Sequence, residues 1–263
     1  MNKYQAPSEF IGKQTIFLES CESTNSLALA ACTENTAEEG LVIIAEHQTK
    51  GRGQMGNRWD SKIGENLLFS IVLKPSISAA EQFFLSKSVA CGIIEGISNW
   101  AKLTFGRSLP LSIKWPNDLY INEKKLGGIL IENQWNSGKW THSVVGIGLN
   151  INQTSFEGLR ATSLKEQLGS SESLEKPDLF NSICLGIEKY YKLCKERHFE
   201  RIDDTYHSYL FRLNEWHLYQ DQSTQEIFDG KILRVNEQGL VIIEKQNGYK
   251  MYDLKEIIFI FPT

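Results

Sequence analysis

The sequence predicts an α+β fold in which helices flank a central β-sheet and a small β-barrel follows at the C-terminal end. Apolar runs of strand length recur between residues 15 and 150, most of them without a helical period. Two segments, 78–97 and 177–197, instead carry apolar residues at helical spacing. Beyond residue 214 the chain holds short strand-like runs only, which is typical of a small barrel.

The expected strands of the central sheet are apolar runs bounded by glycine, proline or polar turns. They are an edge strand at 15–18, then 41–45, 67–73 and 111–115, a hairpin of 118–121 with 125–132, and 144–150. Pro116 ends the ladder of the fourth strand, because proline has no N–H to donate. The glycines of the last strand indicate that another group packs closely against it.

Helices are predicted from capping residues and apolar stripes. Ser23-Thr24-Asn25 precedes an alanine-rich run and supplies N-cap chemistry. Spacing alone favours a cap only, although a helix N-terminus with spare hydroxyls can also bind a polar ligand. Residues 78–81 form a capping box before a long helix. A strong helix follows from Pro177 to Arg197, and a weaker one passes through Tyr206 and Leu210.

Composition changes near Asn214, so we divide the chain into residues 1–215 and 216–263. The polar segment 219–224 is expected to be a linker or an exposed loop. The strands expected beyond it are 227–228, 231–235, 240–244, 249–252 and 257–261. Gln246-Asn247-Gly248 is a strong hairpin signal between two of them.

Bulk composition excludes several classes of protein. The 263 residues hold 28 Lys and Arg against 32 Asp and Glu, a net charge of -4, so binding to bulk nucleic acid is not expected. The sequence has no signal-peptide core and no apolar run of membrane-spanning length. Five cysteines without a Cys-x-x-Cys pair favour reduced thiols in a cytoplasmic protein. The five histidines show no metal-ligand spacing.

The most informative segment is the glycine-spaced loop from Gly51 to Trp59. Glycine lets a backbone approach phosphate and arginine supplies charged donors, so this loop suits an anionic nucleotide. Its glycines also match the dinucleotide fingerprint, but no helix opens at Gly56 and the next apolar run has strand length. The Rossmann interpretation is therefore rejected. An ordinary surface loop would explain the glycines but not Arg52 and Trp59.

A second group of charged and polar residues follows later strands. Lys114-Trp115-Pro116-Asn117-Asp118 ends one strand, and Lys125 precedes a bare Gly127-Gly128 backbone. A lone lysine there is most simply solvated hairpin charge. Combined with Arg52, Arg58 and the Asn–Asp pair, it forms a plausible site for nucleotidyl transfer. The cations would neutralise phosphoryl charge, and the pair would position a metal or a nucleophile.

Together these segments resemble the successive motifs of biotin–protein ligases. The motifs are Ser23-Thr24-Asn25, Gln48-Thr49, Gly51 to Trp59, Lys114 to Asp118, Lys125 to Glu132 and Gly146 to Asn152. Their order and spacing agree from about Thr15 to the C-terminal strands.

The resemblance implies a fold and an activity. The fold is a central mixed β-sheet with flanking helices of the biotin/lipoate ligase type in a catalytic ligase domain, residues 1–215, plus a small SH3-like β-barrel in residues 216–263. The activity is that of a biotin–[acetyl-CoA-carboxylase] ligase, which uses ATP and Mg2+ to form biotinyl-5′-adenylate. Biotin then passes to a lysine of a biotin carboxyl carrier domain. Because the motifs begin near residue 20, we expect the short form without an N-terminal DNA-binding domain or specific DNA binding. A homodimer is compatible with the sequence.

Residue roles are carried over from the family position by position. The residues matched to biotin binding are Ser23, Thr24, Asn25, Gln48, Arg52, Gly53, Gln54 and Lys125. Those matched to ATP or the adenylate are Gly51, Arg52, Trp59, Lys114, Asn117, Lys125 and Asn150. The catalytic set is Lys125, Asp118 and Arg52, with no protein metal ligand assigned. Gln54 and Asn57 depart from the family pattern, where arginines are frequent.

Two alternatives stay open. A lipoate–protein ligase shares the architecture and the adenylation chemistry, although the glycine–arginine loop with Trp59 favours biotin. A non-catalytic biotin-binding regulator would need neither Lys125 nor Asp118.

Overall fold

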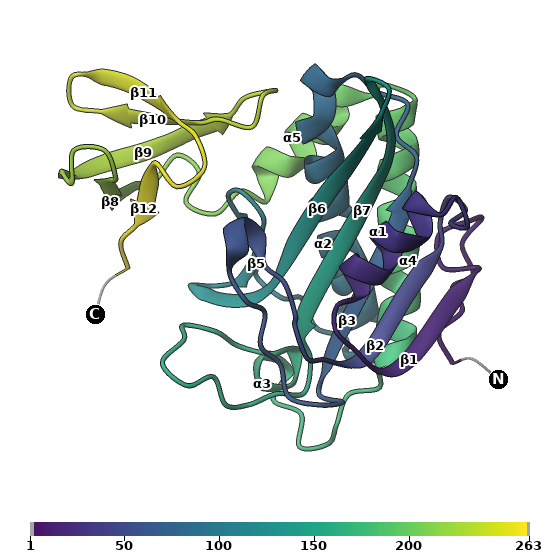
Figure 1. Cartoon of the computed structure of the whole chain (residues 1–263). Helices are drawn as coiled ribbons and strands as arrows, with labels where there is room; N and C mark the ends of the chain where they lie inside the picture. Colours follow the sequence, from purple (N-terminus) through teal and green to yellow (C-terminus); the bar gives the residue numbers. More distant parts are fainter. Residues whose placement is uncertain (1–2, 262–263) are drawn as a thin grey trace.

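A mixed seven-stranded sheet forms the centre of the molecule, whose computed structural model describes residues 3–261 (Figure 1). The strand order is β1-β2-β3-β7-β6-β5-β4. β1 runs parallel to β2, and the other neighbouring pairs are antiparallel, which confirms the expected mixed sheet. The strands are β1 (Thr15–Cys21), β2 (Val42–Gln48), β3 (Asn66–Leu73), β4 (Leu111–Lys114), β5 (Asp118–Ile121), β6 (Lys124–Asn136) and β7 (Lys139–Asn150).

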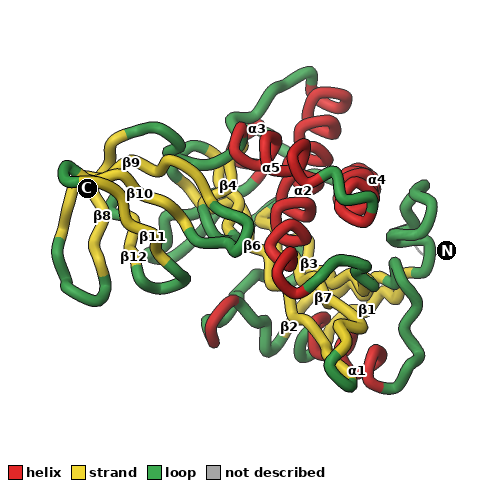
Figure 2. The backbone as a smooth tube through the Cα atoms, turned by 90° about the horizontal axis from the view of Figure 1, so that it is seen from above, coloured by secondary structure: helices red, strands yellow, loops and turns green. Residues whose placement is uncertain are grey.

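Side chains that alternate along the strands divide the core into two layers. Val42 and Ile44 of β2 join the large core under α2 (Gln82–Phe105) and α4 (Lys176–Lys195). Ile43 points to the opposite face and joins a smaller cluster with Ala28 and Cys32 of α1 (Thr24–Thr33). Figure 2 shows α2 and α4 on one side of the sheet and α1 on the other. Among residues 3–261, no helix combines the length and apolar character that crossing a bilayer requires.

Glycines let the backbones of α2 and α4 touch. A Cβ atom on Gly96 would lie 2.6 Å from the Cα atom of Ile183. A Cβ atom on Gly186 would overlap the carbonyl oxygen of Gly92. These positions therefore have no room for a side chain. Where α2 and α4 cross, their backbones are in contact, so both helices can pack on the same face of the sheet.

Shorter helices complete the fold. They are the 3-10 turns η1 (Gln54–Gly56) and η2 (Ala79–Glu81), and the helices α3 (Leu164–Leu168) and α5 (Phe199–Ser208). The expected capping box of Ser78 with Glu81 is present. α5 contains Tyr206 as expected but ends at Ser208, and Leu210 instead forms a β-bridge with Ile113. α3 was not expected, although Ser163 and Glu166 form a capping box there too.

The C-terminal strands form a second, wholly antiparallel sheet beside the first (Figures 1 and 2), in the order β11-β10-β9-β8-β12. The strands are β8 (Trp216–Asp221), β9 (Ile227–Val235), β10 (Val241–Lys245), β11 (Gly248–Tyr252) and β12 (Ile257–Phe259). This small all-β unit completes the expected fold class.

Two expectations for this region were wrong. Residues 219–224 are not all linker, because β8 continues to Asp221 and buries Tyr219 against Phe228 and Phe259. Runs 227–228 and 231–235 are one strand, β9. Gly230 does not form a turn between them but lies where the backbone of β9 packs closely against Ile243 of β10. A Cβ atom there would lie 2.6 Å from Cγ2 of Ile243.

The hairpin of β6 and β7 is longer than expected. The strands continue past 132 and begin before 144, and Ser137 and Gly138 join them with φ angles of 50° and 76°. Two successive positive φ values fit the tight turns that match the twist of a two-stranded ribbon.

Gly186→Ala should destabilise the fold, because the new methyl group meets the backbone of α2. Overpacking of this kind lowers the free energy of unfolding by about 1–3 kcal/mol, which urea denaturation would measure. Leu185→Ala is the control, since Leu185 is 44% exposed and surface changes are usually within about 0.5 kcal/mol. Equal stability of Gly186→Ala and the unmodified protein would contradict the close crossing.

Candidate active site

A cavity of about 400 Å3 opens between the central sheet and the C-terminal sheet. Residues far apart in the sequence line it. Of the residues singled out from the sequence, the structure brings together Ser23, Thr24, Asn25, Gln48, Arg52, Gly53, Gln54, Arg58, Trp59, Lys114, Asn117, Asp118 and Lys125. These residues come from the start of α1, the end of β2 and the glycine loop after it, and the segment from the end of β4 to the start of β6.

One end of the cavity is a buried, uncharged hydrogen-bonding network at the N-terminus of α1. Ser23 caps the helix, and the backbone N–H of Thr24 donates to Oε1 of Gln48 at 2.7 Å. The Thr24 hydroxyl lies 2.7 Å from the Ser70 hydroxyl, which donates to Oδ1 of Asn25 at 2.5 Å. Fixed, neutral donors and acceptors of this kind suit the polar part of a small-molecule ligand.

Glu132 joins this neutral end to the glycine loop. Its carboxylate accepts from Nδ2 of Asn25 at 2.9 Å and forms an ion pair with Arg52 at 2.5 Å. The loop itself is a small hairpin, in which Arg52 pairs with Arg58 and the N–H of Gly53 donates to the carbonyl of Asn57 at 2.7 Å. The loop is therefore anchored to the sheet through one carboxylate.

The indole of Trp59 packs against sheet backbone that carries no side chains, at Gly128 and Gly148. Gly128 and Gly148 are direct partners on β6 and β7, and a Cβ atom on Gly148 would lie 2.6 Å from Cε2 of Trp59. The indole Nε1 is buried and has no hydrogen-bond partner among the described residues. A buried donor without an acceptor costs about 1–3 kcal/mol, so a bound molecule that accepts this hydrogen bond would gain affinity.

The other end of the cavity is cationic. Nζ of Lys125 lies 2.6 Å from Oδ1 of Asp118 and 5.7 Å from the centre of the Trp59 ring. Lys114 lies with its ammonium 4.3 Å from the ring centre of Phe259. Burial lowers the pKa of Lys114, an effect that the Asp118 carboxylate opposes. Two lysines around one carboxylate leave an excess of positive charge for an anion.

Two residues matched to the nucleotide do not line this cavity. Gly51 lines a separate hollow together with Lys50 and Glu132, and its missing side chain makes room for the carbonyl of Trp59. Asn150 is buried and donates to the carbonyl of Thr162 at 3.1 Å. Thr162 in turn donates to the carbonyl of Lys125 at 2.9 Å, so Asn150 contacts the segment that holds Lys125.

The sequence did not reveal the far wall of the cavity. β12 and the turn before it contribute Leu254, Lys255, Ile257, Ile258 and Phe259. No local pattern marks these residues, because they reach the cavity only through the docking of the second sheet. Glu132 is the last residue of the Lys125 to Glu132 motif. Its pairing with Arg52 and Asn25 could not be predicted, because it depends on how the β6–β7 hairpin packs against the glycine loop and α1.

Within residues 3–261, no group of three or more His, Cys, Asp and Glu side chains is placed to hold a metal. Asp118 is the single carboxylate among the described lining residues, and Lys125 already pairs with it.

This geometry defines a site for a ligand that is neutral and polar at one end and anionic at the other. The biotin/lipoate A/B protein ligase family model matches residues 17–150, just over half of the chain. The chain belongs to this family.

Individual relatives support this family assignment. The chain is 30% identical over 253 residues to the bifunctional ligase/repressor BirA of Bacillus spizizenii, covering 94% of this chain and 74% of that protein. The biotin protein ligase from Aquifex aeolicus, solved in complex with biotin and ATP, superposes with a TM-score of 0.75 at 26% identity. That match covers 94% of this chain and 98% of the other. A biotin protein ligase from Leishmania major, at 20% identity and a TM-score of 0.63, shares the fold.

Glu132→Ala should loosen the glycine loop, because it removes the ion pair with Arg52. A partly exposed pair contributes roughly 0.2–1 kcal/mol, so trypsin should cleave after Arg52 and Arg58 about 1.5- to 5-fold faster. Glu22→Ala is the matched control, since it removes an exposed ion pair with the neighbouring Lys50. Identical cleavage rates in both variants would mean that other contacts hold the loop.

Proposed function

We propose that this chain is a biotin–protein ligase. It activates biotin with ATP as biotinyl-5′-adenylate and transfers biotin to a lysine of a biotin carboxyl carrier domain. The observation that carries the proposal is the two-ended cavity, which places Thr24, Asn25 and Gln48 at a neutral end and Lys125 and Lys114 at a cationic end. Biotin has a neutral polar ring system and a carboxylate tail, and the nucleotide brings phosphates to the same place.

The first step joins two anions. A biotin carboxylate oxygen forms a bond to the α-phosphorus of ATP while the bond to the bridging oxygen breaks and pyrophosphate leaves. Lys125, Lys114 and Arg52 offset the repulsion between carboxylate and phosphate. The indole of Trp59 offers a flat apolar surface beside Lys125, which suits a nucleotide base.

In the second step the acceptor lysine attacks the acyl carbonyl of the adenylate, an amide bond forms and AMP leaves. The attacking amine must be neutral and loses a proton. Asp118 lines the cavity beside Lys125 and is the proposed acceptor or orienting group for that proton.

The proposal includes Mg2+ as the ion that accompanies ATP. Since the cavity offers one carboxylate, phosphate oxygens and water would supply most of its ligands, as is usual for magnesium at nucleotide sites. Cytoplasmic location, the absence of specific DNA binding and a homodimer stay predictions from the sequence.

Mass spectrometry of a biotin carboxyl carrier domain incubated with this protein, ATP, Mg2+ and biotin would test the function. A mass gain of one biotinyl group that requires ATP is expected. A gain with lipoate in place of biotin would instead identify a lipoate–protein ligase. Binding of biotin without pyrophosphate release would identify a non-catalytic regulator.

Lys125→Ala should slow biotin-dependent pyrophosphate release by about a hundredfold or more, because it removes a preorganised charge from the reacting phosphate. Lys124→Ala is the control, since the neighbouring Lys124 is exposed and does not line the cavity. A rate for Lys125→Ala close to that of the control would refute the assigned role.

Asp118→Asn should slow transfer to the carrier domain more than formation of the adenylate. The change keeps the size of the side chain but removes its capacity to take a proton. Single-turnover reactions begun from preformed biotinyl-adenylate isolate the transfer step. Equal loss in both half-reactions would instead point to a metal-binding or structural role for Asp118.

A further inference from the structure

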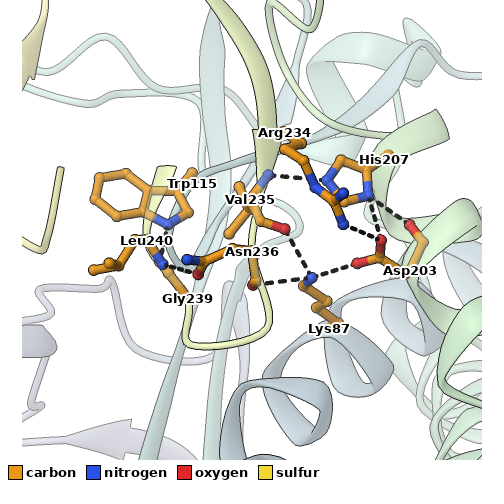
Figure 3. Close-up of polar contacts among 9 residues, drawn as sticks. All are labelled: Lys87, Trp115, Asp203, His207, Arg234, Val235, Asn236, Gly239 and Leu240. Atoms are coloured by element: carbon orange, nitrogen blue, oxygen red, sulfur yellow. Dashed lines mark hydrogen bonds and ion pairs between the residues drawn. The ribbon is translucent and has the colours of Figure 1, made fainter. Parts of the chain in front are cut away.

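Lys87 is a fully buried lysine on α2, beneath the C-terminal sheet. Its ammonium donates to Oδ1 of Asp203 at 2.5 Å and to the carbonyls of Val235 and Asn236 at 3.0 and 3.3 Å. An ammonium has three donors, so all three are used (Figure 3). Three aromatic rings surround it, those of Phe83, Phe84 and Tyr206, at 5.3–5.6 Å.

A second contact ties the same strand to α5. His207 hydrogen bonds through Nδ1 to the carbonyl of Asp203 at 2.8 Å, and its Nε2 accepts from the N–H of Val235 at 2.9 Å. Arg234 pairs with the Asp203 carboxylate at 3.3 Å. Asp203 and Lys87 thus hold the end of β9 against α2 and α5 (Figure 3).

The turn that leaves β9 contacts the proposed active site directly. Asn236 closes this turn, because its Oδ1 accepts from the N–H of Leu240 at 2.9 Å. The carbonyl of Gly239 accepts from Nε1 of Trp115 at 2.8 Å. Gly239 has a φ of 90°, and Phe83 lies so close that a Cβ atom would be 2.6 Å from its ring. The turn therefore packs against Phe83 of α2 and accepts a hydrogen bond from the indole of Trp115.

Trp115 belongs to the segment that carries the cationic end of the cavity. It lies between Lys114 and Pro116, and Asn117 and Asp118 follow at once. The second sheet also carries Phe259, whose ring contacts the Lys114 ammonium. The neutral end is held by separate contacts, those of Thr24 and Gln48 on α1 and β2.

We propose that Lys87 is a positioning residue for the nucleotide: by fixing the 236–239 turn, it sets Trp115, the 114–118 segment and the wall formed by β12. This inference rests on the proposed function and deepens it. It predicts that loss of the Lys87 ammonium weakens the use of ATP and leaves the use of biotin unchanged.

Lys87→Met tests the proposal, because methionine keeps an unbranched chain of similar length among the aromatic rings. We expect the KM for ATP in adenylate formation to rise about tenfold, the scale of coupling through packed networks, and the KM for biotin to stay within about twofold. Asp203 keeps Arg234 as a partner in this variant. Where Lys87→Met nevertheless prevents folding, Lys87→Met with Asp203→Asn also removes the carboxylate charge that Lys87 neutralised. A purely structural role would lower the yield of active enzyme and move neither KM.

Lys176→Met is the matched control. Lys176 is also buried and also binds a carboxylate, that of Glu46, and two carbonyls, those of Gly64 at 2.8 Å and Asn66 at 3.3 Å. It lies on α4, away from the C-terminal sheet. This variant should lose stability through the same kind of contact while its KM for ATP stays unchanged.

Hydrogen exchange without substrates gives an independent measurement. In Lys87→Met, amide exchange should accelerate in both 236–240 and 114–118, and in Lys176→Met it should accelerate in neither. Acceleration confined to 236–240 together with an unchanged KM for ATP would overturn the proposal. Failure of the unmodified protein to form biotinyl-adenylate would refute the proposed function alone, because the exchange pattern does not depend on activity.

Discussion

The proposed active site depends on a short strip without side chains on one face of the central sheet. Gly128, Gly146 and Gly148 line the cavity together, where β6 pairs with β7. A side chain at Gly146 would collide with the Asn25 amide, and one at Gly148 would collide with the Trp59 indole. Because alternate residues of a strand face the same side, the spacing of Gly146 and Gly148 keeps a continuous strip of the sheet bare. The neutral network, the loop and the cationic end are all built around that strip.

Local signals carried most of the fold. The long helices followed from capping residues and apolar stripes, and the strands of the central sheet from apolar runs between turns. The sequence motifs predicted most of the residues that line the cavity from the central sheet, because the end of a strand fixes where the next few side chains lie. β8 was missed because Gln220, Asp221 and Gln222 look like a polar loop. In the structure, Asp221 instead accepts from the turn amides of Ser223 and Thr224 and pairs with Lys250.

The parts that sequence could not reveal are those created by distant contacts. The side chain of Asn150 donates its hydrogen bond to the Thr162 carbonyl. Glu132 forms its ion pair with Arg52, eighty positions earlier in the sequence. Lys87 is a polar residue in a largely apolar helix, and its partners come from α5 and β9, more than a hundred positions later. Each of these residues is a polar group whose partners are chosen by packing, and no spacing rule encodes that choice.

The unpartnered indole nitrogen of Trp59 has a practical consequence. Indole emission responds to hydrogen bonding and to nearby charge. This ring packs against Gly148, its centre lies 5.7 Å from the Lys125 ammonium, and its Nε1 has no partner among the described residues. Any molecule that fills the cavity changes both surroundings at once. The protein therefore carries its own optical probe of occupancy. The part of a ligand-induced emission change that Trp59→Phe abolishes would be the signal of this one ring among the six tryptophans, with no dye attached.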